Sequence, residues 1–270
     1  MSDSLLPSTG DAAKDRKFVT ALSRGLMILQ CFTPKTPELS VSAIARMTKL
    51  PQPTVWRLCY TMQTMGFLVG VAGRDTLRPG LPLLGLGYAV LASQPLPELA
   101  LPAMQDIADR YGGAVSLGGR DGTNMIYLQR AQGLSIILDL RVGDRVPMAF
   151  SATGWAYLAA LEEGEREAIL TQIREQDRDR WAIAEPLFRN ALEEYARVGY
   201  IVTKGMLHPQ INSVAAPVRA ADGSVLFGLS SGGISTEFSD ATLRRLGLEL
   251  KELAKTLGPA LVTSAPPPSP

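Results

Sequence analysis

The sequence predicts an α+β protein with a small, mainly helical N-terminal domain and a larger domain of mixed helices and strands. Its 270 residues exceed a typical single domain. Helical spacing of apolar residues prevails up to residue 68, whereas strand-like segments separated by turns prevail after residue 112. Residues 14–80 hold ten basic and three acidic side chains, a net charge of +7 in a chain whose total is +1. A basic domain joined to an acidic one indicates that only the first meets a polyanion.

The two ends of the chain and its cysteines indicate the cellular compartment. Residues 1–17 are mostly polar and lack the pattern of a signal peptide, so we expect a flexible arm. The proline-rich residues 263–270 are expected to be a disordered tail. Cys31 and Cys59 lie in apolar surroundings, which favours buried thiols in a reducing compartment. We therefore expect a cytoplasmic protein.

The first two helices are predicted from apolar spacing. Positions from Val19 to Phe32 follow a helical period and stop at Thr33-Pro34. A second helix is expected after Ser42, an N-capping residue type, with Ile44, Ala45 and Met47 on its packed side.

The third helix lies in PQPTVWRLCYTMQTMGFL, residues 51–68. Its prolines fall in the first turn, where no helical hydrogen bond is lost, and Gly66 marks its end. Val55, Leu58, Cys59 and Met62 share one face and are expected to pack. The residues directed away from that face near the helix N-terminus, which we expect to contact DNA, are Gln52, Pro53, Thr54, Trp56 and Arg57. They offer base-edge hydrogen bonds and a phosphate-seeking cation, as a major-groove helix requires.

A short hairpin is predicted directly after this helix. Residues 67–79 read as two strands around a Gly-Arg-Asp turn, with Arg74 at the tip and Arg78 beyond it. Both arginines would reach phosphates or the minor groove. Each feature alone is common in ordinary cores, and chance alone gives some unevenness of charge. Together they predict a winged helix-turn-helix over residues 18–80 that binds double-stranded DNA.

The remaining chain predicts a linker helix and a mixed domain. Residues 81–95 are apolar but too short to cross a bilayer, so we expect a buried helix and no membrane partner. Residues 97–111 read as an amphipathic helix, kinked at Pro102, that buries Met104, Ile107 and Ala108. The expected strands are 114–118, 125–130, 135–141, 199–204, 213–219 and 224–230, and the expected helices are 153–161, 166–174, 186–198 and 240–257. This order predicts a mostly antiparallel sheet.

These motifs resemble those of the IclR family of bacterial transcriptional regulators. The N-terminal likeness runs through SRGLMIL (23–29), LSVSAIA (39–45), LPQPTVWRL (50–58) and LLGLG (83–87). The C-terminal likeness runs through VGDRVP (142–147), SATGWAYLA (151–159), EEYARVGY (193–200) and SVAAPV (213–218). The wing departs from the family pattern at LRPG (77–80). The resemblance, over residues 18–258, implies a GAF-like domain over residues 96–262 that binds an effector and forms homodimers, some of them assembling as tetramers.

Two lines of reasoning give candidate effector-binding residues. SATG at 151–154 opens a helix, so the amides of Ala152, Thr153 and Gly154 could hold a carboxylate. The resemblance places Ser213 and Ser230 on the opposite wall of a small-molecule cavity, and it adds Met148 and Thr203. An organic acid, aromatic or not, is the expected effector.

Other side chains near this region have two readings. Trp155 could stack on an aromatic effector or fill the core, which is the commoner role. His208 could contact effector or lie solvated in its loop. Arg141 and Arg145 could pair with an acidic ligand or form surface salt bridges.

The residue inventory speaks against an enzyme. With one histidine and no suitable cysteine pair, the chain predicts no metal site, no cofactor and no catalytic residue. Three hypotheses remain. The first is an effector-controlled regulator, with repression as the family's commoner mode. The second is a DNA-binding protein whose large domain only oligomerises. The third is a carboxylate-dependent hydrolase.

Overall fold

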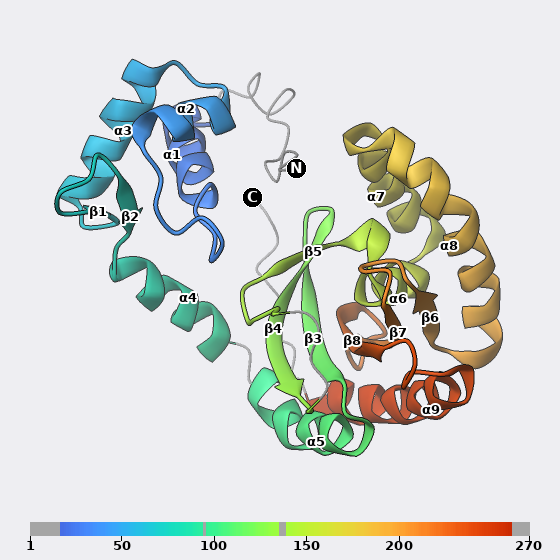
Figure 1. Cartoon of the computed structure of the whole chain (residues 1–270). Helices are drawn as coiled ribbons and strands as arrows, with labels where there is room; N and C mark the ends of the chain where they lie inside the picture. Colours follow the sequence, from blue (N-terminus) through green and yellow to red (C-terminus); the bar gives the residue numbers. More distant parts are fainter. Residues whose placement is uncertain (1–16, 94–95, 135–138, 261–270) are drawn as a thin grey trace. The chain divides into compact units, whose positions relative to one another are not determined.

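A computed structural model describes residues 17–93, 96–134 and 139–260 of the chain (Figure 1). The chain divides into two compact units, and the division falls after Ser93. The predicted arm, apart from Lys17, and the predicted tail lie outside the described residues. The domain boundaries drawn from the sequence therefore stay predictions, and each unit is described by itself.

The first unit consists of three packed helices, a two-stranded wing and a fourth helix. Its elements are α1 (Thr20–Gln30), α2 (Val41–Thr48), α3 (Gln52–Thr64), β1 (Leu68–Gly70), β2 (Leu77–Pro79) and α4 (Pro82–Ala92). Ile28, Ile44, Val55 and Cys59 form its core, together with Cys31. Both cysteines are buried free thiols.

The cap of α2 and the packed residues of α1 and α2 differ from the prediction. Ser40, not Ser42, caps α2, because the Ser40 hydroxyl accepts a hydrogen bond from the Ala43 amide at 3.2 Å. Met47 is exposed rather than packed, since the narrow buried face of this short helix centres on Ile44. In α1 only the C-terminal half packs, so the apolar residues Leu22 and Leu26 are exposed.

The turns around α3 explain its position. Lys49 adopts a left-handed backbone conformation, with φ of 56°, and this turns the chain sharply from α2 into α3. Gly66, with φ of 76°, follows α3 and leads the chain into the wing. Leu39, which precedes α2, pairs with Leu77 of β2 through two backbone hydrogen bonds. The wing is thereby tied to the helical core.

Helix α4 corrects one prediction. The sequence predicts a buried helix, yet no residue of α4 is buried within the described chain. Its exposed apolar side chains are Leu84, Leu86, Tyr88 and Val90. Any burial of this helix must therefore come from outside the described part of the first unit.

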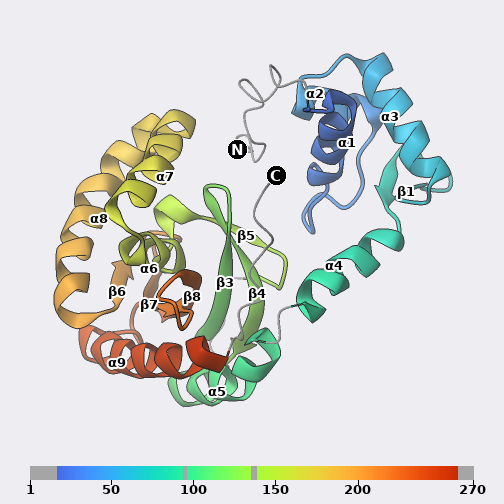
Figure 2. The same cartoon turned by 180° about the vertical axis from the view of Figure 1, so that it is seen from behind.

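The second unit is a six-stranded antiparallel sheet with helices on both faces (Figures 1 and 2). Its strands are β3 (Ala114–Asp121), β4 (Asn124–Gln132), β5 (Arg145–Pro147), β6 (Ile201–Lys204), β7 (Ile211–Arg219) and β8 (Val225–Ile234), in the order β5-β4-β3-β8-β7-β6. Its helices are α5 (Leu96–Tyr111), α6 (Ala152–Ala160), α7 (Glu163–Gln176), α8 (Arg178–Val198) and α9 (Asp240–Leu257). Short 3₁₀ turns, η2 (Met148–Phe150) and η3 (Gly258–Ala260), precede α6 and follow α9.

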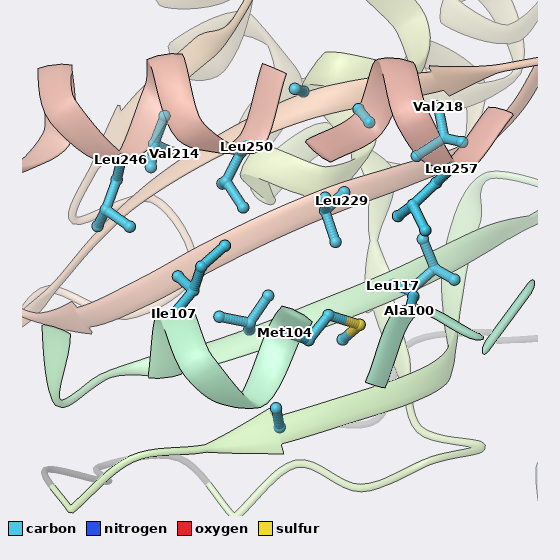
Figure 3. Close-up of a cluster of buried hydrophobic side chains, with 14 of the residues drawn as sticks. Ala100, Met104, Ile107, Leu117, Val214, Val218, Leu229, Leu246, Leu250 and Leu257 are labelled. Carbon is cyan, nitrogen blue, oxygen red and sulfur yellow. The ribbon is translucent and has the colours of Figure 1, made fainter. Parts of the chain in front are cut away.

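Each face of this sheet has its own core. On one face α5 and α9 pack against the strands through Met104, Ile107, Leu117, Leu229 and Leu250 (Figure 3). The predicted burial of Met104, Ile107 and Ala108 is confirmed. On the other face α6, which is buried along its whole length, lies between the sheet and the outer helices α7 and α8. The predicted antiparallel sheet is therefore confirmed.

Three element predictions were wrong in detail. The sequence did not predict strand β5, which is only three residues long. Of the strand expected at 135–141, residues 135–138 lie outside the described residues and residues 139–141 form no strand. Helix α8 begins at Arg178, ahead of the expected start at Pro186, which lies inside it. The first two turns precede Pro186, and a proline removes only one amide donor from such a helix.

Candidate functional site

The exposed surface of α3 carries most of the residues expected to contact DNA. Gln52, Pro53, Trp56 and Arg57 are exposed, and Thr54 is half-buried. On the opposite side Val55, Cys59 and Met62 are buried and Leu58 is half-buried, which anchors the helix to α1 and α2. In the described part of the chain no carboxylate is paired with Arg57. This guanidinium is available to a phosphate or a base edge.

An aromatic pair extends this surface. The rings of Trp56 and Tyr60 stack with centroids 5.6 Å apart and an angle of 16° between their planes, although both are largely exposed. Helical spacing puts Tyr60 on the outward face of α3, but Tyr60 was not among the predicted DNA contacts; its spacing of four residues from Trp56 was the available signal.

The wing arginines differ from each other. Arg78 on β2 is exposed. Arg74 at the wing tip donates from Nη1 to the Glu38 carboxylate at 3.0 Å, and the Arg74 side chain stays 67% exposed. The sequence predicts both arginines as DNA contacts, but Arg74 already has an acidic neighbour. A phosphate would have to compete with Glu38 for it.

The second unit contains a cavity of about 50 Å³ between the sheet and the start of α6. Its polar lining consists chiefly of Ser116, Arg130, Ser151, Thr153, Ser213 and Ser230. Leu140, Leu207 and Ile211 supply apolar side chains, and Gly232 and Gly233 supply backbone. Such a mixed lining is typical of a small-molecule site.

Buried hydroxyls fix the polar end of the cavity. Thr153 Oγ1 donates to Ser230 Oγ at 2.7 Å, and the Ser151 hydroxyl caps α6 by accepting from the Gly154 amide at 3.2 Å. The Gly154 N–H is therefore engaged, and of the three amides expected to face a carboxylate those of Ala152 and Thr153 remain. All three hydroxyl-bearing residues are buried.

The structure brings only part of the predicted set to the cavity. Ala152, Thr153, Ser213 and Ser230 line it. The predicted residues that are not among its lining are Met148, Gly154, Trp155 and Thr203. Trp155 is 2% exposed, packs edge-on against Phe188 and donates from Nε1 to the Ala149 carbonyl at 2.8 Å. Trp155 is a core residue, because its single donor and its ring face are already used.

Arg130 on β4 lines the cavity and was missed by the sequence analysis. Its Nη1 donates to Ser116 Oγ at 3.0 Å, and its guanidinium lies 5.8 Å from the centre of the Tyr127 ring. Burial lowers the pKa of Arg130, although the nearby Tyr127, Asp144 and Asp139 oppose this effect. Arginine stays charged even so, so this residue brings a positive charge to the cavity.

A β-bulge explains why the sequence did not predict Arg130 as a cavity residue. The register between β3 and β4 shifts, so that Ser116 pairs with Arg130 but Gly118 pairs with Tyr127. Tyr127 belongs to the core on the α6 face, whereas Leu128 and Ala131 belong to the opposite core. Strict alternation would put Tyr127 and Arg130 on opposite faces, and the extra residue of the bulge brings them to the same face.

The other candidate side chains lie elsewhere. Arg141 pairs with Asp139 at 3.0 Å on the surface, and Arg145 pairs with Asp121. His208 Nδ1 accepts from the Gln210 amide at 3.3 Å and is not among the cavity residues. These observations favour the structural readings of the three residues.

The described residues lack two features, a membrane-spanning helix and a metal-binding cluster. None of their helices is long and apolar enough to cross a membrane. Within the same residues, no cluster of three or more His, Cys, Asp or Glu side chains could hold a metal ion.

A winged helix-turn-helix followed in one chain by an α+β domain with a polar cavity defines a transcriptional regulator with a ligand-binding domain. The chain belongs to the IclR family. Residues 21–71 match the IclR helix-turn-helix domain, and residues 88–258 match the bacterial transcriptional regulator IclR C-terminal domain.

Known proteins agree with this assignment along most of the chain. The HTH-type transcriptional regulator TsaQ1/TsaQ2 of Comamonas testosteroni is 27% identical over 253 residues, which cover 92% of this chain and 91% of that protein. An IclR family transcriptional regulator from Brucella abortus has a crystal structure that matches with a TM-score of 0.84 and 36% identity, covering 92% and 94% of the two chains. Because these relatives are regulators and not enzymes, the hydrolase hypothesis is set aside.

A more distant structure supplies a ligand for comparison. An IclR homologue from Microbacterium hydrocarbonoxydans, crystallised in complex with 4-hydroxybenzoate, shares the fold with a TM-score of 0.70 at 24% identity, covering 88% of this chain and 98% of that one.

Proposed function

We propose that this regulator represses transcription by binding an operator as a homodimer, and that an organic acid in the cavity releases it. The observation that carries the DNA-binding half is the surface of α3, where exposed polar and aromatic side chains and Arg57 lie directly opposite the buried residues. Dimers would read two half-sites separated by about one helical turn of DNA or a multiple of it.

The acid is supported by the chemistry of the cavity. Buried hydroxyls, two amides at the start of α6 and Arg130 favour an anion at one end. A volume of about 50 Å³ has room for a short acid without rearrangement. A larger acid, such as the 4-hydroxybenzoate bound by the Microbacterium homologue, would need the cavity walls to move.

The test of DNA binding is an Arg57→Ala variant. Because no carboxylate among the described residues competes for Arg57, its loss should weaken operator affinity by about 1–3 kcal/mol and relax selectivity at the base pair it contacts. Fluorescence anisotropy would measure affinity for an operator selected from random sequences and for a scrambled duplex. Arg189→Ala, which removes an exposed arginine of α8, is the matched control. Unchanged affinity and selectivity of Arg57→Ala would contradict the role of α3.

A second measurement separates this proposal from a regulator without an effector. Footprinting of the operator would be repeated with each acid of a metabolite panel. The proposal expects at least one acid to reduce protection in a saturable manner. Protection that no acid changes would favour the alternative in which the second unit only oligomerises.

A further inference from the structure

A positive charge reaches the cavity from a residue outside the start of α6. Arg130 reaches the cavity from β4, on the far side of β3 from the hydroxyl of Ser230. Ser116 connects the two, because its Cα pairs with Arg130 on one side and with Ser230 on the other. Arg130, Ser116 and Ser230 therefore form one row across three neighbouring strands, with Thr153 bonded to the end of that row.

This row holds the guanidinium in place. The hydrogen bond from Nη1 to the buried Ser116 hydroxyl fixes one edge of it, and the ring of Tyr127 lies beside it at 5.8 Å. Asp139 and Asp144 act on the same cation, and Asp139 is also paired with Arg141 at the surface. A guanidinium held in this way brings a fixed positive charge to the cavity, and a carboxylate is the group that guanidinium geometry matches best.

Other residues that line the cavity are apolar. Leu140, Leu207 and Ile211 are apolar, and Gly232 leaves no side chain beside them. A Cβ on Gly232 would come within 2.6 Å of Ser213 Oγ, so a side chain at this position would displace that hydroxyl. The cavity lining thus holds a cation and hydroxyls together with apolar side chains, so it has partners for both the carboxylate and the uncharged remainder of an acid.

We propose that Arg130 is the specificity-determining residue of the effector site, binding the effector carboxylate while its uncharged remainder contacts Leu140, Leu207 and Ile211. The inference rests on the proposed function and adds to it the group that distinguishes an acid from a neutral molecule of the same shape. Arg130 makes the carboxylate obligatory, and the apolar wall sets the size of the rest.

The test compares acids with their own amides on the full-length protein. The probes are acetate, propionate, lactate, benzoate and 4-hydroxybenzoate, each beside its primary amide, with binding measured by calorimetry. At least one acid should bind saturably and at least about tenfold more tightly than its amide. Arg130→Met should remove that difference. The matched control Arg189→Met, which removes an exposed arginine of α8 that does not line the cavity, should retain it.

A third variant covers the case in which Arg130→Met is poorly folded. Arg130→Lys keeps a positive charge but loses the guanidinium geometry, so it should still prefer the acid to the amide with reduced affinity. Equal affinity for acid and amide, undiminished acid binding by Arg130→Met, or the absence of binding by every acid would overturn the inference. Operator affinity without ligand, measured on the same preparations, shows separately whether the DNA-binding half of the proposed function has failed.

Discussion

At the scale of single residues, close backbone contacts decide the position of α6 beside the cavity. A Cβ on Gly154 would lie 2.4 Å from the carbonyl oxygen of Met148, and a Cβ on Gly228 would lie 2.6 Å from the carbonyl oxygen of Thr153. Helix α6 can approach η2 and β8 this closely only because both positions are glycine. Gly154 therefore serves the site through backbone packing and not through ligand contact.

A Gly154→Ala variant tests this role. The added methyl group must displace the backbone of η2, so we expect the free energy of unfolding to fall by about 1–3 kcal/mol. Urea denaturation followed by circular dichroism would measure it. Gly164→Ala is the control, because Gly164 is exposed in α7 and its Cβ would meet nothing within 4 Å. That change should be neutral or stabilise the protein by up to about 1 kcal/mol. Equal effects of the two substitutions would refute the packing argument.

At the scale of elements, the cation at the wing tip, Arg74, is paired with a carboxylate of the same unit. Glu38, in the segment before α2, neutralises Arg74 at the wing tip, and the backbone pairing of Leu39 with Leu77 keeps these two segments together. An exposed ion pair of this kind contributes little to stability. We expect its larger effect to be on DNA binding, because a phosphate would have to displace Glu38 to bind Arg74.

A Glu38→Gln variant should therefore bind DNA more tightly than the unmodified protein. Removing the carboxylate frees Arg74 for a phosphate, so the slope of log affinity against log salt should become steeper by up to about 0.9. Anisotropy titrations at four salt concentrations would give the slope. The double variant Glu38→Gln with Arg74→Ala should lose the added slope. If it kept the steeper slope, the effect would not come from Arg74.

At the scale of the whole molecule, α4 is the element that the rest of the first unit leaves uncovered. Leu84 is 71% exposed in a helix without a buried residue, and contiguous apolar surface of this kind marks an interaction site. Our proposal of a homodimer supplies the missing cover from a second copy of the same helix. The distance between two α3 helices would then depend on how the α4 helices pack.

The change Leu84→Glu should shift the protein from dimer toward monomer. A charge buried in such an apolar interface costs several kcal/mol, so the dimer should dissociate at a much higher protein concentration than the unmodified dimer does. Analytical ultracentrifugation over a concentration series would measure it. Leu248→Glu, at an exposed leucine of α9, is the control and should leave the dimer intact. Dimers of unchanged strength in Leu84→Glu would exclude α4 from the interface.

Effector control also requires a coupling free energy between the cavity and the DNA-binding surface. Coupling between the cavity and α3 of about 1–3 kcal/mol would weaken DNA binding roughly 5- to 150-fold when the acid is bound. Linkage requires that saturating operator weaken acid binding by the same factor. Calorimetric titration of an effective acid with and without operator would check this. Unequal factors would show that the acid acts outside this two-site equilibrium.

Local patterns in the sequence were sufficient for most elements. Proline placement and apolar spacing located α3 and its buried face, and the sequence predicted α9 with the bounds that the structure has. The extra turns of α8 before Pro186 were missed because a proline weakens a helical pattern without ending the helix when the flanking turns are packed. Similarly, only the packing of α2 shows that Met47 faces solvent.

The sequence by itself determined the class of protein, the position and buried face of α3 and the start of α6, because each depends on residues that are neighbours along the chain. Only the tertiary structure decided which side chains line the cavity. It placed Trp155 in the core, set Glu38 against Arg74, and used a bulge in β4 to bring Arg130 to the cavity. These outcomes depend on contacts between distant segments and on strand register, and a one-residue shift in register changes the face that every later side chain occupies.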